Sequence, residues 1–141
     1  MEFRFVVEGG DFTKAGTASS QVKKILKQIN ADPKDIKRLV VALYEAEVNI
    51  VAHAFRGEIL ANIEPDHVTI RLIDEGPGIP DIPMAMQQGF STASSKVREM
   101  GFGAGMGLPN IKKNTDELKI DSVVGKGTTI EMTVFFQKNQ G

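Results

Sequence analysis

Apolar side chains recur every three or four residues between Phe12 and Ile29, with lysines among the intervening positions. This period predicts one amphipathic helix over 12–29 whose lysine side faces solvent. Asp11, directly before it, is of a residue type that caps helix N-termini. Ahead of this helix, Glu2–Val7 alternates apolar and polar positions and predicts a first strand.

A second helix is predicted to begin at Pro33, because Asp32 can cap it and proline fits the first helical position. Its apolar stripe continues to Ala54, and the helix is expected to end near Arg56, with Gly57 as a left-handed stop.

The rest of the chain predicts two hairpins and a short helix. The expected elements are the strands Glu58–Glu64, His67–Asp74, Glu117–Val123 and Thr128–Gln137 and the helix Leu108–Thr115. Between Asp74 and Gly107 the chain is rich in glycine, proline and small polar residues, which prevents continuous core structure. So long a loop in a compact domain is usually a functional lid.

The composition is typical of one globular domain. Hydrophobic residues make up 41% of the 141 residues and charged residues 25%, and no apolar run is long enough to span a bilayer. We expect a single domain over residues 1–141, located in the cytoplasm and not bound to a membrane. A formal net charge of −1 argues against nucleic acid as the main partner. Because the chain has no cysteine and two isolated histidines, a bound metal must take oxygen ligands.

Three polar residues are predicted to share one face of the second helix. Glu45, Asn49 and His53 are spaced four residues apart, which sets them in a row away from the apolar stripe. Such a row is often an ordinary solvated surface. It also suits a magnesium-dependent phosphotransfer site, since an asparagine carbonyl can bind Mg²⁺ and a carboxylate can deprotonate an attacking hydroxyl.

One turn is a candidate for contacts with a nucleotide base. Asp74 ends an apolar strand and is followed by Gly76 and Gly78. Its carboxylate can accept a hydrogen bond from an exocyclic amine, while the glycines let the backbone pass close to a flat ring. A plain surface connection would have the same composition. Gly125–Thr129 by itself has the composition of an ordinary hairpin turn.

Glycine occupies every second position from Gly101 to Gly107, directly before a predicted helix. Unhindered backbone amides at a helix N-terminus can cradle phosphate groups, with a merely flexible loop as the alternative. Lys126 is followed by Gly127 and not by serine or threonine, so it does not complete a P-loop. The Gly-x-Gly-x-x-Gly fingerprint of dinucleotide-binding folds does not occur either.

In this order and at these separations, the four elements resemble the N, G1, G2 and G3 boxes of the GHKL ATPase superfamily, from Val40 to Thr129. Within it, Glu45–His53, Gly76–Pro80 and Gly89–Thr92 are similar to the bacterial anti-sigma factor and switch-protein serine kinases. The resemblance implies a Bergerat ATP-binding fold. This is an α/β (α+β) two-layer sandwich whose mixed, mostly antiparallel sheet is covered on one face by helices, with the lid, about Met84–Phe102, closing over ATP.

The resemblance also implies roles for individual residues. Glu45 would be the catalytic base, Asn49 the Mg²⁺ ligand and Asp74 the residue that reads adenine. The other residues implied to contact ATP are His53, Gly76, Gly78, Ile79, Ser91, Thr92, Lys96, Gly103, Ala104, Gly105, Met106, Gly107, Leu108 and Thr128.

Three functions share such a pocket. We place first a serine/threonine protein kinase, for which the resemblance implies a small anti-sigma-antagonist (STAS) domain as substrate and a sigma factor as a further partner. The first alternative is a non-catalytic protein that sequesters its partner, with ATP only ordering the lid. The second is a stand-alone ATP-binding module of a histidine kinase, although the chain lacks the helical hairpin that carries a phosphoacceptor histidine. The sequence names no substrate and leaves a homodimer open.

Glu47 departs from the expected pattern. A helical step of 100° per residue projects it into the apolar stripe of the second helix. An unpaired charge is costly there. We expect a partner for it, Arg71 on a neighbouring strand, or a local distortion of the helix.

Overall fold

The computed structural model describes residues 1–86 and 107–136. Five strands form one sheet: β1 (Glu2–Glu8), β2 (Arg56–Ile63), β3 (His67–Glu75), β4 (Glu117–Val123) and β5 (Gly127–Phe135). Their order is β1-β2-β3-β5-β4, and each neighbouring pair is antiparallel. Strand β3 is therefore central, with the N-terminal strands on one side and the C-terminal hairpin on the other.

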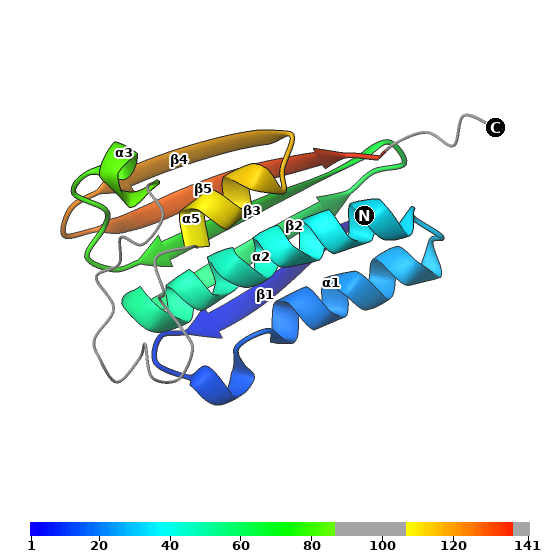
Figure 1. Cartoon of the computed structure of the whole chain (residues 1–141). Coiled ribbons are helices and arrows are strands. Elements are labelled where there is room, and N and C mark those ends of the chain that lie inside the picture. The colour runs from blue at the N-terminus through cyan, green and yellow to red at the C-terminus, as the bar shows by residue number, and fades with distance from the viewer. Residues whose placement is uncertain (87–106, 137–141) are drawn as a thin grey trace.

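Helices cover one face of this sheet, as Figure 1 shows. The helical elements are η1 (Phe12–Lys14), α1 (Thr17–Gln28), α2 (Pro33–His53), α3 (Ile82–Ala85) and α5 (Gly107–Lys113). The core lies between α1, α2, α5 and the sheet, and the two-layer sandwich is confirmed. Among the helices of the described residues, none is long and apolar enough to cross a membrane. A cytoplasmic location stays a prediction.

Alternation of apolar and polar residues sets which strand face is buried. In β2, Ile59, Ala61 and Ile63 point into the core, and in the register Ile59 lies opposite Leu72 of β3. The other face of the sheet carries polar residues and ion pairs such as Arg4 with Glu58. The period-2 pattern thus fixes one buried and one solvated face.

The first helix is interrupted, and the prediction of one helix over 12–29 was wrong. The chain forms the short η1, and then Gly16, with a φ of 93°, precedes α1. Asp11 does not cap a backbone amide; its carboxylate accepts a hydrogen bond from the Thr13 hydroxyl at 2.7 Å. Glycine adopts this left-handed conformation at little cost, which allows the break at this position.

Helix α2 begins as predicted but ends earlier. The carboxylate of Asp32 accepts a hydrogen bond from the Lys34 amide at 2.8 Å, which caps the N-terminus. The helix ends at His53, and the extended chain enters the sheet at once, because the Phe55 amide donates to Glu75 O at 2.8 Å. The prediction that Gly57 ends the helix in a left-handed conformation was therefore wrong, and Gly57 is a residue of β2.

Glu47 is paired, but not with Arg71. Its side chain is 1% exposed and accepts hydrogen bonds from the amides of Gly16, Ala18 and Ser19 at 3.0–3.1 Å, and from the Ser19 hydroxyl at 2.7 Å. Arg71 lies on the solvated face, 3.7 Å from Glu131. The sequence prediction failed because the partners of Glu47 are backbone amides of another helix, which side-chain patterns do not show.

The start of the long glycine-rich segment is more regular than expected. Pro80 is followed by α3, where the Asp81 carboxylate accepts a hydrogen bond from the Met84 amide at 3.1 Å. The predicted lid therefore begins inside a helical turn, and its remainder from residue 87 onward lies outside the described residues.

Candidate functional site

The row of polar residues on α2 lies against α5. Asn110 Nδ2 donates to Glu45 Oε1 at 3.3 Å. One turn further along α2, Asn49 faces Gly107, where an added Cβ would lie 3.2 Å from both terminal atoms of the Asn49 amide. Glu45 and Asn49 are neither buried nor fully exposed, so this face is not an ordinary solvated surface.

His53 follows Asn49 by one further turn and is the last residue of α2. Burial lowers the pKa of its imidazole below the usual range, so the ring is neutral at physiological pH. A neutral ring can donate from one nitrogen and accept at the other. The side chain of His53 thus offers hydrogen-bonding capacity without charge at the end of the polar row.

Asp74 lies near the end of β3, beside the start of β5. Its Oδ1 accepts a hydrogen bond from the Thr128 amide at 3.0 Å. Burial raises the pKa of the Asp74 carboxyl above its ordinary value, and the Thr128 amide opposes part of that rise. Within residues 1–86 and 107–136 no hydrogen bond reaches Oδ2, so this oxygen can accept one from a further donor.

The turn after Asp74 is shaped by close backbone approaches. A Cβ added at Gly76 would lie 3.0 Å from Ala54 Cα, at the end of α2. A Cβ added at Gly127 would lie 2.0 Å from Asp74 O. The second distance excludes any side chain at position 127, and the first leaves little room for one at position 76. Packing of the turn against α2 thus favours glycine at position 76.

Gly78 holds the next part of the turn against β4. It has a φ of 77°, and an added Cβ would lie 2.6 Å from Val123 O. The following amide, of Ile79, donates to Ser122 Oγ at 2.7 Å, and Ser122 Oγ lies 2.9 Å from Thr128 Oγ1. Ser122 and Thr128 therefore fix the position of the turn together.

Ser122 was missed by sequence reasoning. The signal was a polar residue in register with the inward positions Leu118 and Ile120 of β4. A polar side chain at an inward position needs a hydrogen-bond partner. That requirement could have indicated a contact with the turn.

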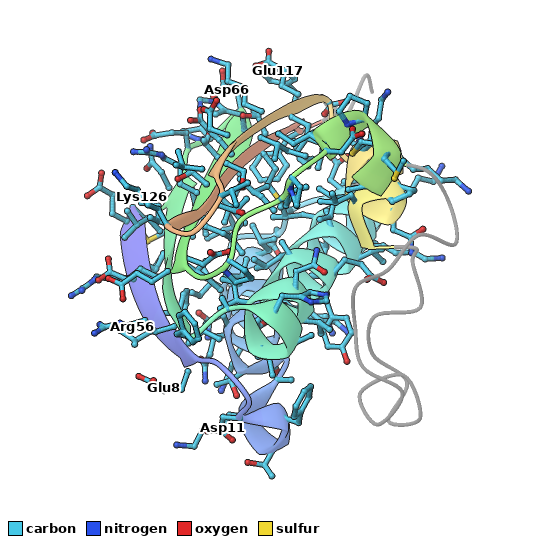
Figure 2. The ribbon with its side chains drawn as sticks, turned by 90° about the vertical axis from the view of Figure 1, so that its left-hand side faces the viewer. Glu8, Asp11, Arg56, Asp66, Glu117 and Lys126 are labelled. Atoms are coloured by element: carbon cyan, nitrogen blue, oxygen red, sulfur yellow. The ribbon has the colours of Figure 1, made fainter. Side chains whose placement is uncertain are left out.

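The structure brings the predicted residues together at one end of the sandwich. Figure 2 views this end, with Lys126 on the β4–β5 turn and Arg56 at the start of β2. Contact between Ala54 and Gly76 joins the polar row of α2 to the turn after β3. Leu108 belongs to the core, with a buried side chain on α5. The predicted residues Ser91, Thr92, Lys96, Gly103, Ala104, Gly105 and Met106 lie outside the described residues.

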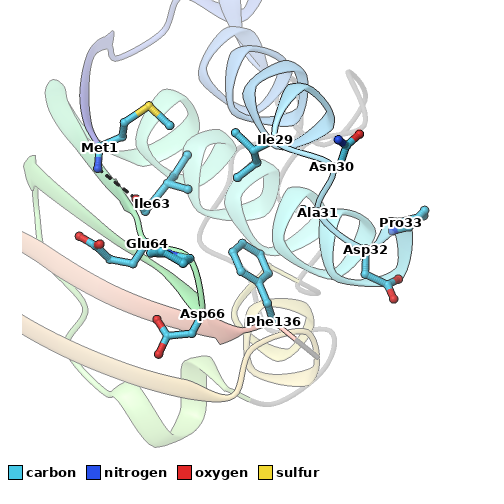
Figure 3. A pocket seen from close by; sticks show the side chains of 11 residues that line it. Met1, Ile29, Asn30, Ala31, Asp32, Pro33, Ile63, Glu64, Asp66 and Phe136 are labelled. Carbon is cyan, nitrogen blue, oxygen red and sulfur yellow. Dashed lines mark hydrogen bonds between the residues drawn. The ribbon is translucent and has the colours of Figure 1, made fainter. Parts of the chain in front are cut away.

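A hollow of about 780 Å³ lies at the other end of the sandwich (Figure 3). It is lined by Ile29, Ile63 and Phe136 among others, where α1 ends and β3 begins. Since Asp74 lies at the far end of β3, this hollow has no part in the site described above.

Within residues 1–86 and 107–136, no three carboxylate or histidine side chains come together as a metal site. Asn49 suits Mg²⁺, because its carbonyl is a hard oxygen ligand and Gly107 has no side chain to cover it.

A polar row on one helix, an aspartate at the end of the central strand and a glycine-shaped turn converge at one end of this sandwich. The family model described as Histidine kinase-like ATPase domain matches residues 11–134. This chain belongs to the histidine kinase-like ATPase family. The expected membership in the GHKL superfamily is confirmed, and the protein contains an ATP-binding domain.

Relatives place this ATPase domain in the anti-sigma kinase branch. It is 32% identical over 145 residues to an anti-sigma F factor of Caldanaerobacter subterraneus subsp. tengcongensis, covering 99% of this chain and 96% of the relative. It is 34% identical over 113 residues to the serine/threonine-protein kinase RsbT of Bacillus subtilis, covering 77% and 79%. The predicted branch is therefore confirmed.

Solved structures agree in fold. The RsbU and RsbW domains of Rv1364c from Mycobacterium tuberculosis match the ATPase domain with a TM-score of 0.65 and 20% identity, over 96% of this chain and 32% of that one. The mycobacterial sensor histidine kinase MprB matches with a TM-score of 0.55 and 16% identity, over 97% and 99%. At these identities the likeness shows the fold alone.

Proposed function

We propose that this ATPase domain is a serine/threonine protein kinase that phosphorylates a small partner protein of the STAS type. The observation that carries the proposal is the placement of Glu45 one turn before Asn49 on α2, with both side chains against α5. The names of two relatives, an anti-sigma F factor and a serine/threonine-protein kinase, support it.

Asp74 would select adenine. One of its carboxylate oxygens is engaged by the Thr128 amide, which fixes the orientation of the group. The other can accept a hydrogen bond from the exocyclic amine of the base. Since Asp74 is half-buried, that hydrogen bond would form away from bulk water and be stronger than an exposed one.

Asn49 would hold Mg²⁺ through its side-chain carbonyl. Mg-ATP, when bound, supplies the phosphoryl group and the cation that neutralises its charge. Magnesium commonly uses one or two protein ligands and leaves its other positions to phosphate and water. A single asparagine ligand at this end of the sandwich is consistent with this coordination preference.

Glu45 would act as the base. Its carboxylate can take the proton of a partner's serine or threonine hydroxyl as that oxygen attacks the γ-phosphorus of ATP, while the bond to the bridging oxygen breaks and ADP leaves. The separation of one helical turn from Asn49 would keep the base near the metal-bound phosphates without competing for the metal. Positioning and charge stabilisation supply most of the rate in phosphoryl transfer, and the base adds to them.

A second candidate function is partner sequestration without chemistry. The name anti-sigma F factor, carried by several relatives, favours a protein whose task includes binding a partner. A sigma factor would then be the client, with ATP affecting only the binding surface. The histidine-kinase alternative rests on the fold likeness to MprB and on nothing more specific.

Phosphotransfer from labelled ATP to purified STAS-domain proteins, followed by mapping of the modified residue, separates these functions. Wild type should yield a phosphoserine or phosphothreonine in the presence of Mg²⁺. Glu45→Gln should bind Mg-ATP and partner normally but transfer phosphate about 10² to 10⁴ times more slowly. Glu131→Gln, a change on the solvated sheet face, is the matched control and should behave as wild type.

A sequestering protein gives another result. Neither wild type nor Glu45→Gln would then label any partner, while both would bind one. Loss of ATP binding in Glu45→Gln would instead assign Glu45 to the organisation of the pocket, and its role as base would lose its support.

A further inference from the structure

We propose that Asn110 is a positioning residue that holds the Glu45 carboxylate for proton transfer. The proposal rests on the proposed kinase function and adds to it a residue that none of the sequence motifs contains. It follows from the hydrogen bond of 3.3 Å between Asn110 Nδ2 and Glu45 Oε1, in a partly buried setting.

The helix that carries Asn110 is itself fixed. Leu108 and Ile111 of α5 are buried in the core, with exposed fractions of 7% and 0%. At the end of α5, Asn114 Nδ2 donates to Asn110 O at 2.8 Å, which ties down the backbone of Asn110. A side chain on so well anchored a helix can orient a neighbour with little loss of its own entropy.

Two residues of α5 face the two proposed functional residues of α2. Gly107 faces Asn49, and Asn110 faces Glu45. A step of three residues along α5 therefore matches a step of four residues along α2. Figure 1 shows α5 beside α2 on the same face of the sheet. One short helix therefore sets the surroundings of both the proposed base and the proposed metal ligand.

An asparagine is chemically suited to this position. Its amide donates to one carboxylate oxygen of Glu45 and leaves the other to accept the proton of a substrate hydroxyl. The amide carries no titratable proton of its own, so it does not compete as an acid. An aspartate at position 110 would remove the donor and place a second negative charge beside the base.

Kinetics of phosphotransfer to a STAS-domain protein test the role. Asn110→Ala should lower kcat by about tenfold with the Kd for Mg-ATP unchanged, because a hydrogen bond to a charged group that orients the base is lost. Asn110→Asp should lower kcat further. Lys112→Ala, an exposed change on the same helix, should leave kcat as in wild type.

A double-mutant cycle distinguishes positioning from a general structural effect. In a Glu45→Gln background, Asn110→Ala should cause no further loss of rate, since there is no base left to position. An equal fold loss in both backgrounds, or a wild-type kcat for Asn110→Ala, would overturn the inference while leaving the kinase function in place.

Side-chain amide NMR gives a readout that does not depend on activity. The Asn110 NH₂ resonances should move in Glu45→Ala and stay in place in Glu131→Ala, whereas unmoved resonances in Glu45→Ala would overturn the contact. If wild type labels no STAS protein, the kinase function fails and the positioning role fails with it. That outcome is recognised from wild type alone, before any Asn110 variant is measured.

Discussion

Glu47 on α2 accepts a hydrogen bond of 2.7 Å from the hydroxyl of Ser19 on α1. The same carboxylate accepts hydrogen bonds from backbone amides at the start of α1, which have no partner within the helix. A buried negative charge thus lies at the positive end of the helix dipole. This arrangement joins the two helices side by side on the sheet. It also explains how the apolar stripe of α2 tolerates a carboxylate.

Replacing that carboxylate should destabilise the fold. Glu47→Gln keeps the shape but presents an NH₂ group to backbone amides that also donate, and we expect the free energy of unfolding to fall by about 2 to 3 kcal/mol. Urea unfolding followed by circular dichroism measures it. The control Glu131→Gln on the solvated face should change it by less than about 0.5 kcal/mol. Equal stabilities for the two variants would contradict the capping role.

Asp74→Asn should weaken ATP binding by about 1 to 3 kcal/mol, because the adenine amine would lose a charged acceptor in a partly buried pocket. Isothermal titration calorimetry with Mg-ATP measures the change, and circular dichroism checks the fold. Asp121→Asn, an exposed change on β4, is the control. Unchanged affinity in a folded Asp74→Asn protein would rule out the adenine-reading role.

The raised pKa of Asp74 predicts a pH dependence of stability. Because burial favours the neutral form, the folded protein binds a proton at pH values where the unfolded chain has already released it. The free energy of unfolding contributed by Asp74 therefore falls as the pH rises from about 3.9 through the higher folded pKa. The free energy of unfolding of wild type and of Asp74→Asn is measured by urea unfolding at several pH values. The difference, wild type minus variant, should fall as the pH rises. A difference that rises with pH would mean that the carboxylate is stabilised in its charged form.

Two glycines with similar positive φ angles should differ in their tolerance of alanine. Gly78 and Gly125 have φ values of 77° and 82°, but only at Gly78 would a Cβ meet other atoms within 4 Å. Gly125→Ala should cost about 1 to 2 kcal/mol from backbone strain alone. Gly78→Ala should cost about 1 to 3 kcal/mol more, because the turn must move away from Val123. If thermal unfolding shows the same loss of stability for both variants, the turn at Gly78 can move away from Val123 without cost.

Asn49→Ala should remove the magnesium dependence of nucleotide affinity. We expect ATP to bind the variant with similar Kd in Mg²⁺ and in EDTA, whereas wild type should bind more tightly with the metal. Calorimetry in both buffers gives the comparison. Asn62→Ala, on β2 away from this end, should retain the wild-type response. A full magnesium effect in Asn49→Ala would place the metal on other ligands.

Periodicity was sufficient for the parts of the fold whose signals are local. The strand Glu117–Val123 was predicted with its observed bounds, and the Asp32 cap of α2 was read correctly from two residues. The break before α1 was not predictable in this way. At the break, the Gly16 amide donates to Glu47, which is 31 residues away in sequence. Such a contact exists only once α1 packs on α2.

In the candidate site, too, only the residues with local sequence signals could be predicted. Glu45, Asn49 and Asp74 were recognisable from residue type, spacing and family resemblance. Asn110 and Ser122 were not, because each acts through a neighbour on another element and leaves no spacing pattern of its own. Residues that orient a site are specified by tertiary packing, so their roles appear only in three dimensions.

The central position of β3 has a consequence for the order of events during synthesis. Its partner β2 precedes it directly, so the β2–β3 hairpin can pair early, whereas β5 follows after more than 50 residues: Asp74 must wait for Thr128, 54 positions later. A nascent chain on the ribosome thus has its aspartate in place long before the amide that orients it emerges. Because a ligand stabilises only the state that binds it, any nucleotide that relies on the oriented Asp74 carboxylate can assist folding only after Thr128 has left the ribosome.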